Sequence, residues 1–289
     1  MVTGASGVVG EAVVRALVSR DEVRATVRRQ DTAEAVRALG AKVAVRTIER
    51  SDDLAEILQR VHTVIHLIGG PNQPDDDEVL AANHRSVLAA VDAARELEVG
   101  RFILASVPGA DPDADDVFLR AKGLAEEAVT SSGLDHAILR LAPVYGVGGL
   151  WFTAVVQGAL AAPPLAVGDP DRLAAPVFAD DVGALVAALD DRPDRIRGTY
   201  GFEGADAVSI RDLLHLLRGD DLEPDVLDEA ESAARLSDVL EIPVSSTAAR
   251  YLATAGVARD APDAGTVVQV RRTGLLDGLR TTLERVGAG

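Results

Sequence analysis

Through residues 1–145, short runs of apolar residues alternate with segments in which apolar residues recur every three or four positions. The first pattern is typical of buried strands and the second of amphipathic helices. Their regular alternation predicts a Rossmann-type α/β fold, a doubly wound parallel sheet with helices on both faces. The predicted strands are residues 23–27, 42–45, 63–68, 101–106 and 137–141, and the predicted helices are residues 8–19, 32–39, 53–60, 79–97 and 117–131.

The pattern loosens after residue 146, where the pairs Gly148-Gly149 and Pro163-Pro164 indicate loops. Residues 172–189 predict a short strand and a helix, and later residues predict helices separated by turns, the last over 275–286. We therefore expect one domain over residues 1–146 and a smaller, mainly helical substrate lobe over residues 147–289. Within that lobe, residues 172–200 are expected to pack back on the first domain.

A glycine-rich segment, Thr3-Gly4-Ala5-Ser6-Gly7-Val8-Val9-Gly10, lies just before the first predicted helix. Glycines at this spacing let the backbone turn tightly, approach a pyrophosphate and pack the helix against the sheet. The amino end of the helix also presents unpaired N–H groups and the positive end of its dipole. The segment therefore predicts a dinucleotide site that uses Gly4, Ser6, Gly7, Val8 and Gly10.

Only Met1 and Val2 precede this segment, although the strand before such a loop normally lies at the centre of the sheet. Either that strand is a stub, or the natural chain starts some residues upstream. A sheet without its central strand would leave backbone groups unpaired on both neighbouring strands, so we expect the upstream start.

The predicted strand 23–27 is followed by Arg28 and Arg29. In an NAD site an acidic residue lies here and accepts hydrogen bonds from the ribose 2′-hydroxyl, whereas guanidinium groups match a 2′-phosphate. Two solvated surface arginines are the alternative, because the chain is rich in arginine. We expect the cofactor to be NADP(H), with NAD(H) as the less favoured possibility.

The net charge of −17 argues against nucleic acid and anionic membrane surfaces as partners. No apolar stretch is long enough to span a bilayer, and no signal peptide is apparent, so we expect a cytoplasmic protein without membrane insertion. Cysteine is absent, which excludes disulfides and thiol catalysis. The histidines lack metal-ligand spacing, so no metal is expected. The only two lysines are Lys42 and Lys122, which makes the role of each a question.

Together, these motifs and others resemble the extended and atypical short-chain dehydrogenase/reductase superfamily. The nearest branches are the NmrA-like proteins and the NADPH-binding accessory subunit of respiratory complex I, and the resemblance covers nearly the whole chain. It implies that Leu67, Ile68 and Gly69 line the adenosine ribose, that Lys122 binds the nicotinamide ribose, and that Pro143 and Val144 face the nicotinamide. The landmarks are Thr3 to Gly10, Val27-Arg28-Arg29, Val64-Ile65-His66-Leu67-Ile68-Gly69, Asn83, Arg101-Phe102-Ile103-Leu104-Ala105-Ser106, Phe118-Leu119-Arg120-Ala121-Lys122, Leu139-Arg140, Val144-Tyr145-Gly146 and Val177-Phe178-Ala179-Asp180-Asp181-Val182.

The chain departs from this superfamily at the catalytic tyrosine. The oxidoreductases use Tyr-x-x-x-Lys, in which the lysine lowers the pKa of a tyrosine one helical turn away, and that phenol exchanges a proton with the substrate. Here Phe118 stands four residues before Lys122 and has no proton to exchange. No tyrosine is expected nearby, because Tyr145, Tyr200 and Tyr251 lie in other segments. The candidate catalytic residues are therefore Lys122 and Ser106, and Ser106 could equally cap its strand.

Several other polar residues have a structural interpretation. His66 lies in an apolar strand and is expected in the core, and Asn83 is expected to bond a neighbouring backbone. Asp180 and Asp181 are expected to cap the helix that follows them. The substrate is expected between the domain and the lobe, where Trp151 and Phe152 are pocket walls or ordinary packing residues.

Three functions remain open. The first is an NADP(H)-binding protein without turnover, such as a cofactor sensor or assembly factor with a protein partner. The second is an NADPH-dependent reductase that uses Lys122, or a water that it positions, as proton donor for a small-molecule substrate. The third and weakest is a sugar-nucleotide epimerase or dehydratase, because those reactions depend on the missing tyrosine.

Overall fold

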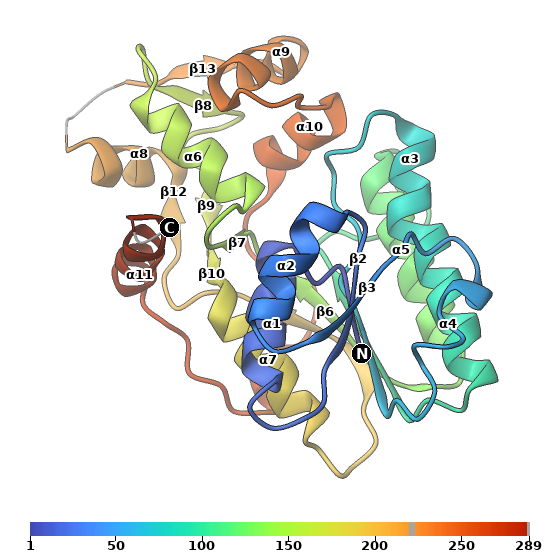
Figure 1. Cartoon of the computed structure of the whole chain (residues 1–289). Coiled ribbons are helices and arrows are strands. Elements are labelled where there is room, and N and C mark those ends of the chain that lie inside the picture. Colours follow the sequence, from blue (N-terminus) through green and yellow to red (C-terminus); the bar gives the residue numbers. More distant parts are fainter. Residues whose placement is uncertain (220–222, 288–289) are drawn as a thin grey trace.

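The computed structural model describes residues 1–219 and 223–287, and its centre is a seven-stranded parallel sheet (Figure 1). The strands lie in the order β11-β6-β5-β4-β1-β2-β3, with β1 and β4 adjacent near the middle. The predicted Rossmann-type α/β class is therefore confirmed. The bounds are β1 Val2–Thr3, β2 Arg24–Val27, β3 Lys42–Val45, β4 Thr63–His66, β5 Arg101–Ser106, β6 Asp135–Leu141 and β11 Arg197–Phe202. The strand before the glycine-rich segment is thus two residues long in this chain, paired with β2 on one side and β4 on the other.

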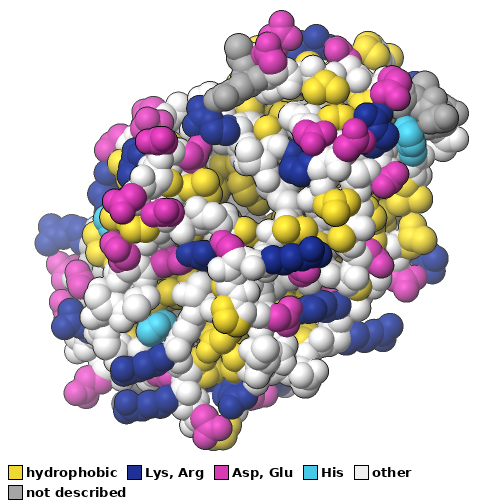
Figure 2. All heavy atoms as spheres, turned by 180° about the vertical axis from the view of Figure 1, so that it is seen from behind, with side chains coloured by type: hydrophobic (Ala, Val, Ile, Leu, Met, Phe, Trp, Pro, Cys, Tyr) yellow, Lys and Arg dark blue, Asp and Glu magenta, His cyan; other side chains and the backbone are white. Residues whose placement is uncertain are grey.

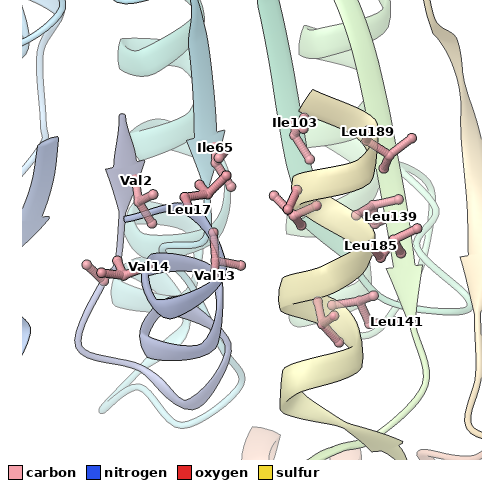
Figure 3. Packing of buried hydrophobic residues seen from close by; sticks show 14 of the residues in the cluster. Val2, Val13, Val14, Leu17, Ile65, Ile103, Leu139, Leu141, Leu185 and Leu189 are labelled. Carbon is pink, nitrogen blue, oxygen red and sulfur yellow. The ribbon is translucent and has the colours of Figure 1, made fainter. Parts of the chain in front are cut away.

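Helices cover both faces of the sheet, because successive strand side chains point to opposite sides. Ile103 of β5 belongs to a core with α1 (Val8–Leu17), α2 (Gln30–Ala38) and α7 (Ala179–Asp190). Figure 3 shows Val13 and Leu17 of α1 and Leu185 and Leu189 of α7 packed against this face. Phe102 and Leu104, which flank Ile103 in β5, belong to the core on the other face. That core also includes residues of α4 (Ser86–Glu96) and α5 (Val117–Ser131).

The helix predicted over 79–97 is interrupted by one wide turn. It consists of α3 (Asp76–Leu80), a π-helical turn η2 (Ala81–Arg85) and α4. π-helical turns within α-helices frequently mark functional positions because they redirect side chains. Here the turn carries Asn83, which is fully buried.

A second group of helices has its own apolar core, and we call it the second lobe. Trp151, Phe152, Leu213, Leu236 and Leu252 are among its buried residues. Its helices are α6 (Leu150–Leu160), α8 (Ile210–Arg218), α9 (Glu229–Leu240), α10 (Ser246–Thr254) and α11 (Leu275–Gly287). Three short strand pairs accompany them: β7 (Val144–Tyr145) with β10 (Val177–Phe178), β8 (Leu165–Val167) with β13 (Asp225–Leu227), and β9 (Leu173–Ala174) with β12 (Val208–Ser209).

Three local predictions were wrong. In place of the helix predicted over 53–60, residues 54–60 form turns after a 3-10 helix, η1 (Ser51–Asp53). Buried Leu54 and Leu58 had produced the helical spacing. Strand β11 falls where turns and helices were expected, because its two glycines hide the pattern and pairing with β6 sets its conformation. The two aspartates after Ala179 do not cap α7. Asp180 pairs with Arg15 and Arg285, whereas Asp181 accepts two hydrogen bonds from Thr273.

The surface has no face of one charge on the side shown in Figure 2, where acidic and basic side chains are interspersed. Within residues 1–219 and 223–287, no helix is both long and apolar enough to cross a bilayer.

Candidate functional site

A cavity of about 540 Å³ lies at the carboxyl ends of β1, β2, β3 and β4. Open parallel sheets bind their ligands at this edge, because the loops leaving the strands converge there. The cavity wall includes Gly4, Ser6, Gly7, Arg28, Leu67, Ile68 and Gly69, all of which were predicted to bind the cofactor. We call this cavity the phosphate end of the site.

The glycines of the loop are required by close backbone approaches. Gly4 has φ +66°, and a Cβ there would lie 2.9 Å from the backbone of Leu67 and Ile68. A Cβ at Gly10 would lie 2.3 Å from the Gly4 carbonyl oxygen, so only glycine lets α1 pack this closely. Gly7 precedes α1 without a capping side chain, which leaves the N–H groups of the first turn available to an anion.

Val8 has a packing position instead of a place on the cavity wall. A Cβ built at Gly146 would lie 2.9 Å from Val8 Cγ2, so this side chain contacts the loop that follows β7. Gly10 likewise acts through packing. The predicted loop therefore contains cavity-lining residues and residues that support them.

The two arginines after β2 point to different environments. Arg28 lines the cavity and makes no hydrogen bond or ion pair with any described residue. Arg29 is absent from the cavity wall and forms an exposed pair with Asp31, whose carboxylate raises the pKa of the guanidinium. Arg28 therefore lines the cavity, whereas Arg29 is an exposed residue at the start of α2.

Two further arginines, Arg46 and Arg85, line the same cavity and were not predicted. Arg46 directly follows β3, so the rule that ligands meet the carboxyl ends of strands could have identified it. Arg85 lies in η2, bonded to Asp77 at 2.9 and 3.0 Å, and no sequence signal placed it here. The acids Glu49 and Glu78 also lie on the wall.

Lys122, Asn83 and Gly69 meet beside the cavity, and we call this region, with Phe118, the lysine end. Gly69 has φ +128°, and a Cβ there would lie 2.4 Å from Asn83 Oδ1 and 3.2 Å from Lys122 Nζ. Asn83 accepts a hydrogen bond from Gly70 N at 2.8 Å and donates to Gly70 O at 3.0 Å. The Asn83 amide therefore fixes the loop after β4, in line with the prediction that it hydrogen-bonds a neighbouring backbone.

The Lys122 ammonium is almost completely removed from solvent, with 6% of the residue exposed. Burial lowers its pKa to about 8, although nearby Glu126 acts in the opposite direction. Nζ donates one hydrogen bond, to the Ala105 carbonyl at 3.1 Å. An ammonium has three N–H donors, so two of them lack a partner among the residues described.

Ser106 donates its hydroxyl proton to Glu126 at 2.5 Å. Glu126 also receives two hydrogen bonds from Arg140, at 2.8 and 3.0 Å, and Arg140 reaches Asp260 at 2.7 Å. The serine proton is therefore directed at a carboxylate that ties α5 to β6. His66 is fully buried, and burial lowers its pKa to about 3, so it stays neutral in the core as expected.

Phe118 is 2% exposed and has an aromatic neighbour that was not predicted. Its ring centroid lies 5.6 Å from that of Tyr251, with the planes at 83°, and 5.9 Å from Lys122 Nζ. The expectation that no tyrosine lies nearby was therefore wrong. Tyr251 belongs to α10 of the second lobe, and only the packing of that lobe brings it to α5.

The remaining predicted positions are Pro143, between β6 and β7, and two aromatic residues of the second lobe. Pro143 follows β6, and its carbonyl accepts a hydrogen bond from Val177 N at 2.9 Å. Trp151 and Phe152 are buried in the core of the second lobe, and Trp151 also lines a small cavity of about 30 Å³ there. Figure 2 shows hydrophobic side chains in a hollow between the upper and lower parts of the molecule.

Residues 4–145 match a family described as NAD(P)H-binding. The chain is 29% identical over 217 residues to (4-alkanoyl-5-oxo-2,5-dihydrofuran-3-yl)methyl phosphate reductase of Streptomyces griseus, covering 73% of this chain and 70% of that protein. It is 26% identical over 143 residues to the photosystem II assembly factor Ycf39 of Cyanophora paradoxa, covering 49% of this chain and only 44% of the relative.

Solved structures share the fold. UDP-glucuronic acid 4-epimerase from Bacillus cereus, with UDP-glucuronic acid and NAD, has a TM-score of 0.75 at 18% identity, covering 99% of this chain and 98% of that chain. The NADPH-dependent quinone oxidoreductase QOR2 of Escherichia coli, with NADPH, has a TM-score of 0.73 at 19% identity, covering 97% and 98%. With the glycine-rich loop and its cavity, the family match shows that residues 4–145 form an NAD(P)H-binding domain, and the solved structures show that the chain shares the fold of dinucleotide-binding enzymes.

Proposed function

We propose that this protein is an NADPH-dependent reductase in which Lys122 holds the nicotinamide end of the cofactor. The observation that carries the proposal is the buried Lys122 ammonium beside Gly69 and Asn83, with a single hydrogen bond to described residues. Burying an ammonium without full hydrogen bonding costs stability, so an apolar side chain would serve packing better. The two N–H groups left over suit the paired hydroxyls of a ribose.

Arg28 supports NADPH over NADH. Its guanidinium lies on the cavity wall at the end of β2, where the adenosine ribose is expected, and no described residue pairs with it. A guanidinium matches the charge and geometry of a 2′-phosphate. Arg46 and Arg85 add positive charge to the same wall, in a chain whose net charge is −17.

When bound, NADPH supplies a hydride, and the chain provides binding and orientation. The first turn of α1 would bind the pyrophosphate, and Pro143 with Val144 would lie along the nicotinamide. Phe118 has no proton to donate, which favours acceptors whose reduced form is a delocalised anion, such as an unsaturated carbonyl compound or a quinone. The relative from Streptomyces griseus is named as a reductase of an oxo-dihydrofuran, which agrees with that acceptor class.

Cofactor binding without turnover is the second candidate function. Phe118 in place of tyrosine favours it, and the relative from Cyanophora paradoxa is named as an assembly factor. This candidate uses the same binding residues and differs only in predicting no hydride transfer. A sugar-nucleotide epimerase is not proposed, because the likeness to the epimerase is one of fold and the reaction needs a tyrosine at the Phe118 position.

The test is to titrate the purified full chain with NADPH and NADH, following the fluorescence of the reduced nicotinamide. NADPH oxidation is then measured with menadione, 2-cyclohexenone and benzaldehyde. We expect NADPH to bind at least about tenfold more tightly than NADH, and menadione or 2-cyclohexenone to be reduced. Tight NADPH binding without oxidation by any of the three acceptors would favour the second candidate function.

A further inference from the structure

Helix α10 of the second lobe is fastened to the two segments that flank the lysine end. Ser245, the cap of α10, donates its N–H to Asn72 Oδ1 at 2.9 Å, and Asn72 Nδ2 donates to the Pro243 carbonyl at 3.0 Å. These contacts join α10 to the loop after β4. They fix the amino end of α10 close to the loop that carries Gly69.

A second connection joins α10 to the start of α5. Arg250 Nη1 lies 2.9 Å from Asp116 Oδ2, and the other oxygen of Asp116 caps α5 by accepting from Phe118 N at 2.9 Å and Leu119 N at 3.0 Å. Asp116 therefore caps the amino end of α5 and also pairs with Arg250, the residue before Tyr251. This explains why the Tyr251 ring lies edge to face with Phe118, 5.6 Å away.

The Tyr251 side chain connects two apolar clusters, yet its hydroxyl is unused. The ring packs against the core of the second lobe and against the small cluster of Val79, Val117, Phe118 and Ala121. Its hydroxyl makes no hydrogen bond with the residues described, and it is not among the polar atoms sealed from solvent without a partner. The side chain is half-buried and its ring contacts Phe118 of the lysine end, so its unpaired hydroxyl is available to a bound molecule.

We propose that Tyr251 donates the proton in the reduction, replacing the phenol that Phe118 lacks. This inference rests on the proposed reductase function. In the step, the acceptor carbon gains a hydride from NADPH, which is oxidised to NADP⁺. The O–H bond of Tyr251 breaks and its proton joins the enolate or hydroquinone oxygen, so the acceptor gains two electrons and two hydrogens. A proton taken up from the solvent then restores the phenol, so the overall reaction consumes one NADPH and one H⁺.

Tyr251 is protonated at neutral pH, so it can donate to a strongly basic oxygen such as that of an enolate. Burial raises the pKa of its phenol to about 12, so the phenol keeps its proton at neutral pH. Charged groups on the elements packed against it include Arg250, the preceding residue of α10, Asp116 at the start of α5, and Lys122, whose Nζ lies 5.9 Å from the Phe118 ring centroid. The donor thus comes from the second lobe, whereas the cofactor is held by the sheet and its loops.

The test is the variant Tyr251→Phe, which removes only the hydroxyl. We expect kcat for NADPH oxidation by menadione or 2-cyclohexenone to fall about 100-fold, while the Kd for NADPH changes less than about twofold. Tyr200→Phe, a half-buried tyrosine of β11, is the matched control and should retain wild-type kcat and Kd values. Adding Phe118→Tyr to Tyr251→Phe should restore part of the lost rate, because it places a phenol one turn before Lys122.

A binding measurement tests separately whether the Tyr251 hydroxyl forms a hydrogen bond with the acceptor. Menadione is titrated by calorimetry into protein loaded with NADP⁺, which has no hydride to give. We expect Tyr251→Phe to bind menadione about three- to tenfold more weakly, because one hydrogen bond is lost. Wild-type kcat and menadione affinity in Tyr251→Phe would overturn the role of Tyr251 and leave the reductase function in place. A wild-type protein that binds NADPH and oxidises none of it would overturn both.

Discussion

The phosphate end and the lysine end of the site are assembled over different distances along the chain. The phosphate end is built by loops and a helix within the first 86 residues, all at the carboxyl edge of neighbouring strands. The lysine end needs α5, η2 and a helix of the second lobe, with Lys122 and Tyr251 both in contact with the Phe118 ring. The comparison indicates that cofactor binding follows from local motifs, whereas the chemistry depends on how the lobes pack.

Lys122→Met tests the lysine end most severely. The variant keeps a long side chain and removes the ammonium, so we expect NADPH oxidation to fall at least about 100-fold through loss of cofactor positioning. The free energy of unfolding should rise by about 1 kcal/mol, because a buried charge is replaced by an apolar group. Lys42→Met, at an exposed lysine paired with Glu22, is the control and should change neither quantity. A fully active Lys122→Met protein would remove this residue from the site.

Arg28→Ala tests the phosphate end. We expect the Kd for NADPH to rise about 10- to 100-fold and the Kd for NADH to stay constant, since only NADPH carries the 2′-phosphate. Arg29→Ala is the matched control, because Arg29 already pairs with Asp31 outside the cavity. Equal losses of NADPH affinity in the two variants would show that the arginines contribute only general charge.

Between pH 8 and pH 10 the pH dependence of stability should report chiefly on Lys122, because the raised pKa values of Tyr145 and Tyr251 act above pH 10 and the lowered pKa of the Met1 amino group acts below pH 8. The pKa of Lys122 falls from 10.5 to about 8 on folding, so between these values the unfolded chain binds more protons and stability rises with pH. The rise is at most about 1.4 kcal/mol per pH unit. NADPH affinity should weaken above pH 8 as the ammonium is lost. Chemical denaturation and fluorescence titration across this range check both trends, and both should disappear in Lys122→Met.

Arg250→Ala should have the smallest effect, because its ion pair with Asp116 is partly exposed. We expect the KM for menadione to rise about two- to fivefold while the Kd for NADPH stays constant, since only the placement of α10 is loosened. A change confined to NADPH affinity would contradict the assignment of α10 to the acceptor side.

The sequence predicted most of the sheet and the phosphate end. Strands β2 to β6 and helices α1 and α5 follow from apolar periodicity, and Gly4, Gly7 and Arg28 follow from motif position. Arg29 was assigned to the site as well, but a local pairing with Asp31 decides where its side chain lies. A sequence motif does not reveal which of two adjacent arginines faces the ligand.

Tertiary packing determined what the sequence could not predict. Tyr251 lies more than a hundred residues from Phe118 along the chain, and the link through Arg250 and Asp116 has no sequence signature. Strand β11 owes its conformation to pairing with β6. Ser106 looked available in sequence, but Glu126, one turn after Lys122 on α5, takes its proton.

The most direct test follows the fluorescence of protein-bound NADPH after rapid mixing with menadione. Saturated wild-type protein should first show the signal of bound NADPH and then lose it as hydride leaves the nicotinamide, faster than free NADPH at the same concentration. Lys122→Met, loaded at a concentration that compensates for weaker binding, should keep its signal on that timescale. A persistent signal in the wild-type protein, or equal decay in both proteins, would contradict a reductase site organised by Lys122.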